Sequence, residues 1–388
     1  MRRKAWVRAI DRYMGMLLIR LFALSYHLTR NHLPQAPPNA RVLFIKFAGM
    51  GDAILLKPVV ALFKRLCPDN ELHFLTSPAI LEVVQYLRLQ QGGGIFVFDP
   101  VLCFKRPMGV VALINDLRKQ HFDIVVDFEQ WMRTSALLAF ATGAQCRIGF
   151  KTPGQHRDAL YTHVIPYSFT EHTLLSFARL ASIVIGTDIS ALALRCFPKC
   201  IKSEINALAT VRQKLASASW RVEKGPLVIL HPGCGRGGEP RVWLPDRYAE
   251  LVRRLIDMNV TVVLTGGDDD RMLIERIKRE LDSMPVIDLA GDLSFAELVA
   301  LVSSADLVVC PNTGIMHLAA AVGTPVIALH GPTNPAQWRP IGDEHHIIQS
   351  PLPCVPCLRL GYDYQCRDYP CMSAITFDIV WEAVKARL

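Results

Sequence analysis

The order of strand-like and helix-like segments is the feature of this sequence that most limits its possible folds. From residue 41 onward, short apolar runs alternate with amphipathic stretches, and the alternation restarts at residue 227. Alternating strands and helices predict parallel sheets with helices on both faces. We therefore expect an α/β protein with two Rossmann-like, doubly wound domains facing a central cleft, where ligands bind beyond the carboxyl ends of the strands.

The alternation also predicts where the elements and domains lie. The expected strands are 41–47, 72–76, 95–98, 123–127, 227–231, 260–264, 286–289, 307–310 and 326–330. The expected helices include 53–66, 78–87, 109–120, 245–258, 294–303, 314–322 and 376–387. Five segments follow: a basic amphipathic helix with a Pro-rich linker (1–39), an N-terminal α/β domain (40–185), a linker region (186–224), a C-terminal α/β domain (225–350), and a Cys-rich segment with a final helix (351–388).

The charge of the chain is concentrated at its beginning. The net charge is +8, and +6 of it lies in residues 1–40, where Asp11 is the single acidic residue. A nucleic-acid-binding surface spreads its basic excess over the folded body, so we expect no nucleic-acid partner. Basic residues beside apolar ones favour the surface of an anionic membrane instead.

The N-terminal segment itself predicts a surface helix. Its uncharged runs are shorter than the roughly 20 apolar residues that a spanning helix needs. Arg20 interrupts the apolar stretch and no small-residue cleavage site follows, so a cleaved signal is not expected. The residues leave two possibilities open: a helix lying on the membrane, or an ordinary helix packed on the first domain.

A short loop between the first strand and its helix contains Gly49, Gly51 and Asp52. A dinucleotide-binding loop is disfavoured because Ile54 stands at the third glycine position of that motif. The two glycines allow a tight turn and the close approach of a substrate, and we assign them to acceptor binding. Asp52, in the first turn of the helix, is either the general base that accepts a proton from an acceptor hydroxyl or a helix cap.

Two loops of the second half predict a phosphate site. The segment with Asn312, Thr313, Gly314 and His317 opens a helix after a strand, where free N–H groups suit phosphate. Its alternative is an ordinary N-cap with a histidine packed in the core.

The glycine-rich loop 231–238 precedes Arg241 and Trp243. Gly233 would let a phosphate or sugar approach, and Arg236 and Arg241 would neutralise a diphosphate leaving group. A solvated loop with Trp243 packed beneath it is the alternative.

Basic residues after the strand 123–127 predict a surface for an anionic acceptor. Arg133, together with Arg147, Lys151 and Arg157, forms this set, although solvated charges are the commoner fate of such residues.

The cysteines fall into two groups. Seven of the eleven are scattered in mostly apolar runs, which is typical of small core residues in a reducing cytoplasm. The other four, Cys354, Cys357, Cys366 and Cys371, are spaced as in some structural zinc sites, but a redox pair or free thiols fit as well.

Taken in order, these segments resemble glycosyltransferase family 9, the bacterial heptosyltransferases of lipopolysaccharide core assembly. The segments that carry the resemblance are 41–52, 123–133, 231–243, 264–267, 288–291, 312–317 and 323–325. The resemblance implies a GT-B fold and an inverting mechanism, with Asp52 as general base. It places the acceptor on the N-terminal domain and the nucleotide sugar on the C-terminal one.

Three positions depart from the family pattern. Asn312 stands where the family has aspartate, Arg241 where it has lysine, and Glu129, assigned to acceptor binding, where many members have glutamine. Arginine keeps the positive charge and adds a fork that suits phosphate, whereas asparagine loses a charge.

The resulting expectation is transfer of a sugar, heptose from ADP-heptose by resemblance, onto a lipopolysaccharide core or related anionic lipid-linked acceptor. The enzyme would act in the cytoplasm, on the inner face of the bacterial inner membrane, without a cofactor for catalysis. Two alternatives remain at this point: an epimerase-like enzyme of free nucleotide sugars, and a non-catalytic nucleotide-binding protein at the membrane.

Overall fold

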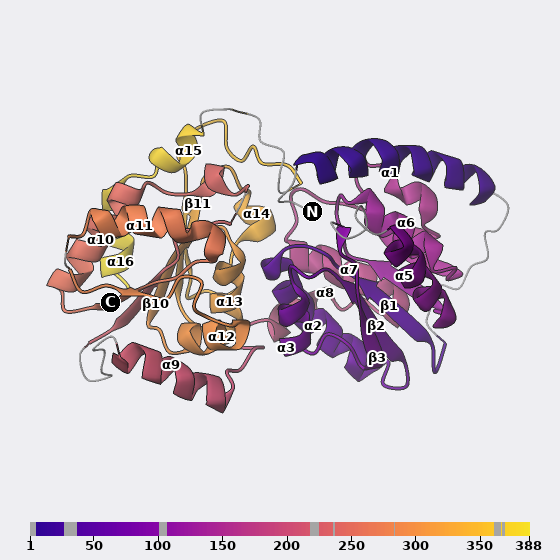
Figure 1. Cartoon of the computed structure of the whole chain (residues 1–388), viewed down its shortest axis with the longest axis horizontal. Coiled ribbons are helices and arrows are strands. Elements are labelled where there is room, and N and C mark those ends of the chain that lie inside the picture. Colours follow the sequence, from indigo (N-terminus) through magenta and orange to yellow (C-terminus); the bar gives the residue numbers. More distant parts are fainter. Residues whose placement is uncertain are drawn as a thin grey trace. The chain divides into compact units, whose positions relative to one another are not determined.

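Two six-stranded parallel sheets organise the chain, each within its own compact unit, and the division falls between Cys196 and Phe197 (Figure 1). The computed structural model describes residues 5–26, 37–100, 107–217, 225–235, 237–282, 284–360, 366 and 369–388. This division lies inside the stretch 186–224, which the sequence predicts to be the linker region. The expected pair of doubly wound sheets is confirmed.

Unit 1 contains the first sheet and the helices around it. Its strands are β1 (Arg41–Ile45), β2 (Glu71–Thr76), β3 (Gly92–Val97), β4 (Ile124–Asp127), β5 (Cys146–Lys151) and β6 (His163–Pro166). Its helices are α1 (Ala5–Tyr26), α2 (Met50–Leu66), α3 (Leu81–Tyr86), α5 (Pro107–Lys119), α6 (Arg133–Ala141), η1 (Arg157–Leu160), α7 (Thr173–Ile185) and α8 (Ser190–Cys196).

Unit 2 repeats the arrangement. Its strands are β7 (Leu227–Leu230), β8 (Thr261–Leu264), β9 (Ile287–Asp288), β10 (Leu307–Pro311), β11 (Val326–His330) and β12 (His346–Gln349). Its helices are α9 (Ile205–Ser217), η3 (Glu239–Arg241), α10 (Pro245–Asp257), η4 (Asp268–Asp270), α11 (Arg271–Arg279), α12 (Phe295–Ser303), α13 (Gly314–Val322), α14 (Pro335–Trp338), α15 (Pro370–Ser373) and α16 (Phe377–Lys385).

The two sheets share one strand order. It runs β3-β2-β1-β4-β5-β6 in unit 1 and β9-β8-β7-β10-β11-β12 in unit 2. In each, the chain moves outward from the first strand, then returns to the middle and continues on the other side. Ligands of such sheets bind where the order reverses, beyond the carboxyl ends of the two central strands. These switch points are β1/β4 in unit 1 and β7/β10 in unit 2.

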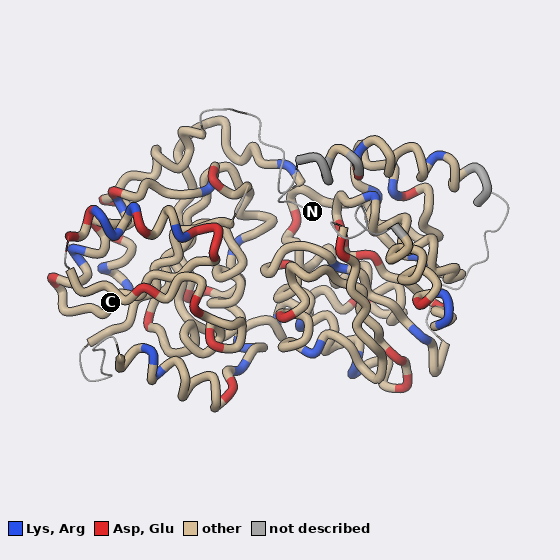
Figure 2. The backbone as a smooth tube through the Cα atoms, viewed as in Figure 1, with Lys and Arg blue, Asp and Glu red and all other residues tan. Residues whose placement is uncertain are grey.

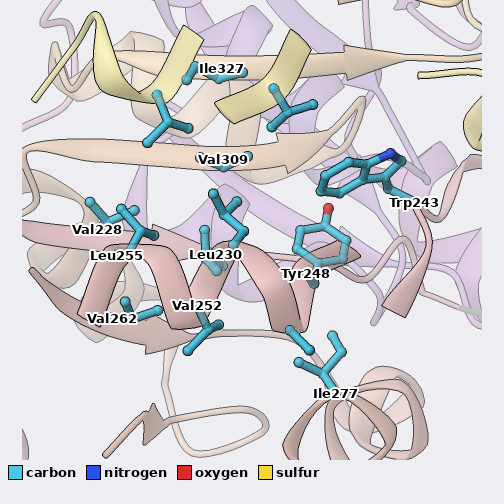
Figure 3. Packing of buried hydrophobic residues seen from close by; sticks show 14 of the residues in the cluster. Val228, Leu230, Trp243, Tyr248, Val252, Leu255, Val262, Ile277, Val309 and Ile327 are labelled. Atoms are coloured by element: carbon cyan, nitrogen blue, oxygen red, sulfur yellow. The ribbon is translucent and has the colours of Figure 1, made fainter. Parts of the chain in front are cut away.

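Central strands of unit 2 are apolar along their whole length because helices cover both faces of the sheet. β7 and β10 are buried at every position. Side chains alternate between the two faces of the sheet. Residues on one face pack against α10, as Figure 3 shows for Val228, Leu230, Val309 and Ile327. Trp243 lies in the same cluster and is fully buried.

Several elements were not expected from the sequence. β5, β6 and β12 extend the sheets, α6 and α7 follow in unit 1, and α14 and α15 lie in unit 2. Two residues inside β5 are unusual for a strand: Arg147 is buried, and Gly149 lies against Tyr161 so closely that an added Cβ would be 2.4 Å from the ring. Neither feature is typical of a strand pattern.

The N-terminal helix α1 belongs to unit 1 and lies beside α6 (Figure 1). Among the residues that the structure describes, no helix is long and apolar enough to cross a membrane.

Candidate active site

The turn from β1 to α2 places Asp52 at the switch point of the first sheet. Gly49 precedes the helix with φ 91°, a backbone conformation that favours glycine, and an added Cβ would lie 3.0 Å from the Asp52 carboxylate. Gly49 occupies the N-cap position of α2, so Asp52, in the first turn, is not the N-cap residue. Asp52 is 4% exposed.

A buried lysine holds this carboxylate. Lys46 Nζ lies 2.8 Å from Asp52 Oδ2 and 3.3 Å from Glu129 Oε1, and the lysine is fully buried. Gln130 completes the group: its Oε1 accepts from Lys46 Nζ at 3.1 Å, and its Nε2 donates to Asp52 Oδ2 at 3.5 Å. We call these four residues the lysine cluster. Charges removed from water need such partners, so the cluster fixes the position of Asp52.

Glu129 joins the loops that follow β1 and β4. Its Oε1 accepts from the backbone N–H of Phe47 at 2.7 Å and of Ala48 at 3.1 Å. Because Glu129 is fully buried, in this structure it holds the 47–48 backbone and presents no surface to a saccharide. Its assignment to acceptor binding therefore rests on the resemblance alone.

Arg157 contacts the same segment from η1. Its Nη2 lies 2.7 Å from Asp127 Oδ2 and 2.7 Å from the Tyr161 hydroxyl, and its Nη1 donates to the Glu129 carbonyl. Burial alone would lower the pKa of Arg157, but Tyr161 and Asp127 outweigh it and raise that pKa above its ordinary value. The fully buried guanidinium is a structural element, not a group facing an anionic acceptor as expected.

The other predicted acceptor arginines are also engaged within unit 1. Arg147 lies near the amino end of β5, away from the switch point, and its Nε donates to the Leu160 carbonyl at 2.9 Å. Arg133 begins α6, and its Nη2 donates to the Gly154 carbonyl at 3.0 Å. The structure does not bring these two guanidinium groups into the lysine cluster, whereas Gly49 and Gly51 lie in the turn beside Asp52.

The two predicted phosphate loops meet at the switch point of the second sheet. Arg241 Nη1 donates to the Asn312 carbonyl at 2.9 Å, which joins the loop after β7 to the loop after β10. Asn312 Nδ2 donates in turn to the Trp338 carbonyl at 3.2 Å, a bond that an aspartate could not make. This contact gives a structural reason for asparagine at the position where the family has aspartate.

The amino end of α13 lies directly after β10, at the switch point of the second sheet. Thr313 occupies the N-cap position, but its side chain does not cap the helix, and its buried Oγ1 has no hydrogen-bond partner among the residues that the structure describes. The first N–H groups of α13, from Gly314 on, therefore lack a side-chain cap and suit an anion. His317, one turn further, is 3% exposed, and its ring centroid lies 6.5 Å from that of Trp338.

Asp270 shapes the glycine-rich loop, a role that the sequence did not reveal. Its Oδ1 accepts from Gly235 N and its Oδ2 from Gly267 N, both at 2.9 Å, so it joins the loops after β7 and β8. Gly233 passes close to it: an added Cβ would lie 2.1 Å from the Asp270 Cγ. Arg236, also predicted here, lies outside the described residues.

The C-terminal cysteines do not form a metal site among the described residues, where no group of three or more His, Cys, Asp or Glu side chains is arranged to hold an ion. Burial, together with the neighbouring Cys357 and Cys366, raises the pKa of the Cys371 thiol to about 11. A structural zinc at these residues and Cys354, one of the possibilities that their spacing leaves open, stays a prediction.

Comparisons with known proteins show the family to which the chain belongs. Residues 110–367 match the family described as glycosyltransferase family 9 (heptosyltransferase). The chain is 29% identical over 309 residues to lipopolysaccharide heptosyltransferase 3 of Escherichia coli K12, which covers 75% of this chain and 82% of that protein. Its fold is similar to that of a family 9 glycosyltransferase from Veillonella parvula, with a TM-score of 0.72 at 16% identity over 91% of this chain and 98% of the other. It is also similar to E. coli ADP-heptose LPS heptosyltransferase II, with a TM-score of 0.68 at 21% identity over 89% and 98% of the two chains.

Two doubly wound units of this kind form a GT-B fold. The family match covers well over half of the chain. The chain belongs to glycosyltransferase family 9, the heptosyltransferase family. It is therefore an enzyme, and the non-catalytic alternative does not hold.

Proposed function

We propose that the chain transfers a heptose from ADP-heptose to a hydroxyl of a lipopolysaccharide core acceptor, with inversion at the anomeric carbon. The name of the E. coli K12 relative supports the sugar and the acceptor. The nucleotide comes from the name of the E. coli protein of similar fold. An acceptor of this kind is lipid-linked, so we assign the reaction to the cytoplasmic face of the inner membrane.

Asp52 is the general base in this proposal. The observation that carries it is the lysine cluster: a buried ammonium 2.8 Å from Asp52 Oδ2 stabilises a negative charge at the switch point of the first sheet. The contacts from Lys46 and Gln130 both go to Oδ2. We assign the other oxygen, Oδ1, to the acceptor hydroxyl, whose proton it takes as the hydroxyl oxygen attacks the anomeric carbon. Such proton transfer contributes about 10²–10⁴ in rate.

The diphosphate of the donor binds at the switch point of the second sheet. The amino end of α13 offers N–H groups without a side-chain cap, and Arg241 donates to the carbonyl of Asn312, two residues before the helix begins. A guanidinium and a helix amino end both stabilise the charge that develops on the departing diphosphate. No step in this scheme requires a metal ion.

Transfer assays with a panel of nucleotide sugars test the proposal. The purified chain is incubated with truncated lipopolysaccharide and ADP-heptose, ADP-glucose, UDP-glucose or GDP-mannose, and the product mass is measured. We expect the acceptor to gain the mass of one heptose unit with ADP-heptose alone. Transfer of a different sugar in preference to heptose would contradict the donor assignment. Turnover of ADP-heptose without any acceptor would favour the epimerase-like alternative.

The zinc hypothesis is tested separately from the reaction. Metal analysis of the purified chain should find one zinc per chain, and a variant with Cys354→Ser and Cys357→Ser should contain none. Absence of zinc from the unmodified chain would contradict the hypothesis without affecting the proposed transfer.

A further inference from the structure

One face of α1 packs on unit 1, and the opposite face carries apolar side chains into solvent. Asp11, Gly15 and Ile19 follow one another at intervals of four residues and are buried. On the other side lie large apolar side chains that are half or more exposed: Tyr13 (65%), Met14 (51%), Leu17 (52%) and Leu21 (54%). A helix that is already packed on its domain gains nothing from such a second apolar stripe unless something else covers it.

The exposed charged side chains that the structure describes on α1 are all positive. Asp11 is the one acidic residue of the first 40, and it points inward: its Oδ2 accepts from Arg133 N at 3.1 Å and its Oδ1 from Thr134 N at 2.8 Å. The remaining charged side chains that the structure describes on α1 are the exposed Arg12 and Arg20, and Figure 2 shows basic positions along this helix.

The same contacts fix α1 in place. Asp11 satisfies the free N–H groups at the start of α6, where the chain's own N-cap, Met132, cannot. Gly15 lies so close to Arg133 that an added Cβ would be 2.8 Å from the arginine Cβ. α6 begins directly after the segment that contains Glu129 and Gln130, which contact Lys46 and Asp52. The start of α6 therefore connects α1 to the segment that positions Asp52.

We propose that the outward face of α1, formed by Tyr13, Met14, Leu17 and Leu21 with the flanking Arg12 and Arg20, binds the surface of an anionic lipid bilayer. Apolar side chains enter the boundary between headgroups and acyl chains while arginines contact lipid phosphates. A second copy of the chain is a poorer occupant because two N-terminal segments with a positive excess would meet face to face. The proposal rests on the proposed function and deepens it. A membrane-bound α1 would hold unit 1, to which we assign the acceptor, at the surface where a lipid-linked acceptor lies.

Vesicle co-sedimentation of the full chain tests the proposal. Vesicles of phosphatidylglycerol with phosphatidylcholine are compared with vesicles of phosphatidylcholine alone. The test variant is Leu17→Glu with Leu21→Glu. The matched control is Ile205→Glu with Met272→Glu, two apolar residues of unit 2 that are 84% and 82% exposed. We expect the test variant to lose about tenfold or more in partitioning to the anionic vesicles and the control variant to match the unmodified chain.

Three outcomes would contradict the proposal. Undiminished binding of the test variant, or equal binding of the unmodified chain to neutral vesicles, would overturn it. The third is sedimentation velocity that shows a dimer of the unmodified chain and a monomer of the test variant, with no vesicle binding by either.

Circular dichroism and thermal unfolding establish whether the test variant is folded. Arg12→Gln with Arg20→Gln is a milder second variant that should also weaken binding to anionic vesicles. Transfer to a delipidated acceptor should be equal for all variants, and its absence from the unmodified chain would contradict the proposed function but not lipid binding.

Discussion

Lys46 Nζ lies 2.8 Å from Asp52 Oδ2, and both side chains are buried at the carboxyl end of β1. The two residues stand on either side of the turn at Gly49, so the same turn that starts α2 brings them together. Glu129, from the loop after β4, shares the ammonium at 3.3 Å. The proposed base is thus held by the two loops of the switch point, and its charge has a fixed partner.

Loss of the ammonium should destabilise unit 1. Lys46→Met leaves two buried carboxylates without their cation, which costs about 3–5 kcal/mol in unfolding free energy. Adding Asp52→Asn should recover part of this loss, with a coupling of about 0.5–3 kcal/mol. Urea unfolding of the single and double variants measures it. Lys119→Met, at an exposed pair with Asp116, is the control and should change stability by less than about 0.5 kcal/mol. Strictly additive effects would refute the pairing.

Glu129 should tolerate glutamine better than alanine. Glu129→Gln keeps the Oε1 that accepts from Phe47 N and Ala48 N, whereas Glu129→Ala leaves both buried N–H groups unsatisfied. An unsatisfied buried donor costs about 1–3 kcal/mol, so alanine should lower stability by at least that amount and glutamine by less. Thermal unfolding compares the two variants. Equal losses for glutamine and alanine would mean that the 47–48 backbone does not depend on this oxygen.

Arg241 should determine the affinity for the nucleotide. Arg241→Met removes the guanidinium at the amino end of α13, and we expect ADP binding to weaken by about 10- to 100-fold. Arg241→Lys keeps the charge but loses the bidentate fork, so its affinity should lie in between. Calorimetric titration with ADP gives both values. Arg254→Met on α10, whose side chain is half exposed, is the control and should bind ADP normally. An unchanged Kd for Arg241→Met would place the diphosphate elsewhere.

His330 should make the fold sensitive to acid. Burial lowers the pKa of His330 to about 3, below the roughly 6.5 of the unfolded chain. The unfolded state therefore binds more protons than the folded state between these values, and stability is lost as the pH falls from about 6.5 toward 3. From about pH 7.5 to 5.5, this histidine should account for about 1 kcal/mol of the loss. His330→Asn should reduce the loss over that interval by this amount in urea unfolding, and an identical pH profile would contradict the prediction.

Much of the fold could be predicted because central parallel strands are nearly continuous apolar runs bounded by glycine-rich loops. β1, β7 and β10 have this pattern, and each was expected within two residues of its observed end. β5 escaped prediction because its buried Arg147 and its close-packed Gly149 depend on neighbours that no local pattern reveals.

The site was predictable where its chemistry is local and hidden where it depends on distant contacts. Asp52 and Arg241 stand in recognisable turns. In the sequence, Lys46 is the end of an expected strand, and its partner Glu129 lies far along the chain. Their pairing follows only from the fold, in which β1 and β4 are neighbours. Asp270 is one of three consecutive aspartates, and nothing in that run distinguishes the one that turns inward. Arg157 carries a charge that suggested a ligand, yet its partners are all internal.

Single-turnover transfer by Asp52→Asn is the measurement that tests the central claim most directly. Asparagine keeps the shape of the side chain but cannot accept a proton, so transfer should slow by about 10²–10⁴. ADP binding, which we assign to unit 2, should stay within about twofold of the unmodified chain. A transfer rate within about tenfold of the unmodified enzyme would show that Asp52 is not the base.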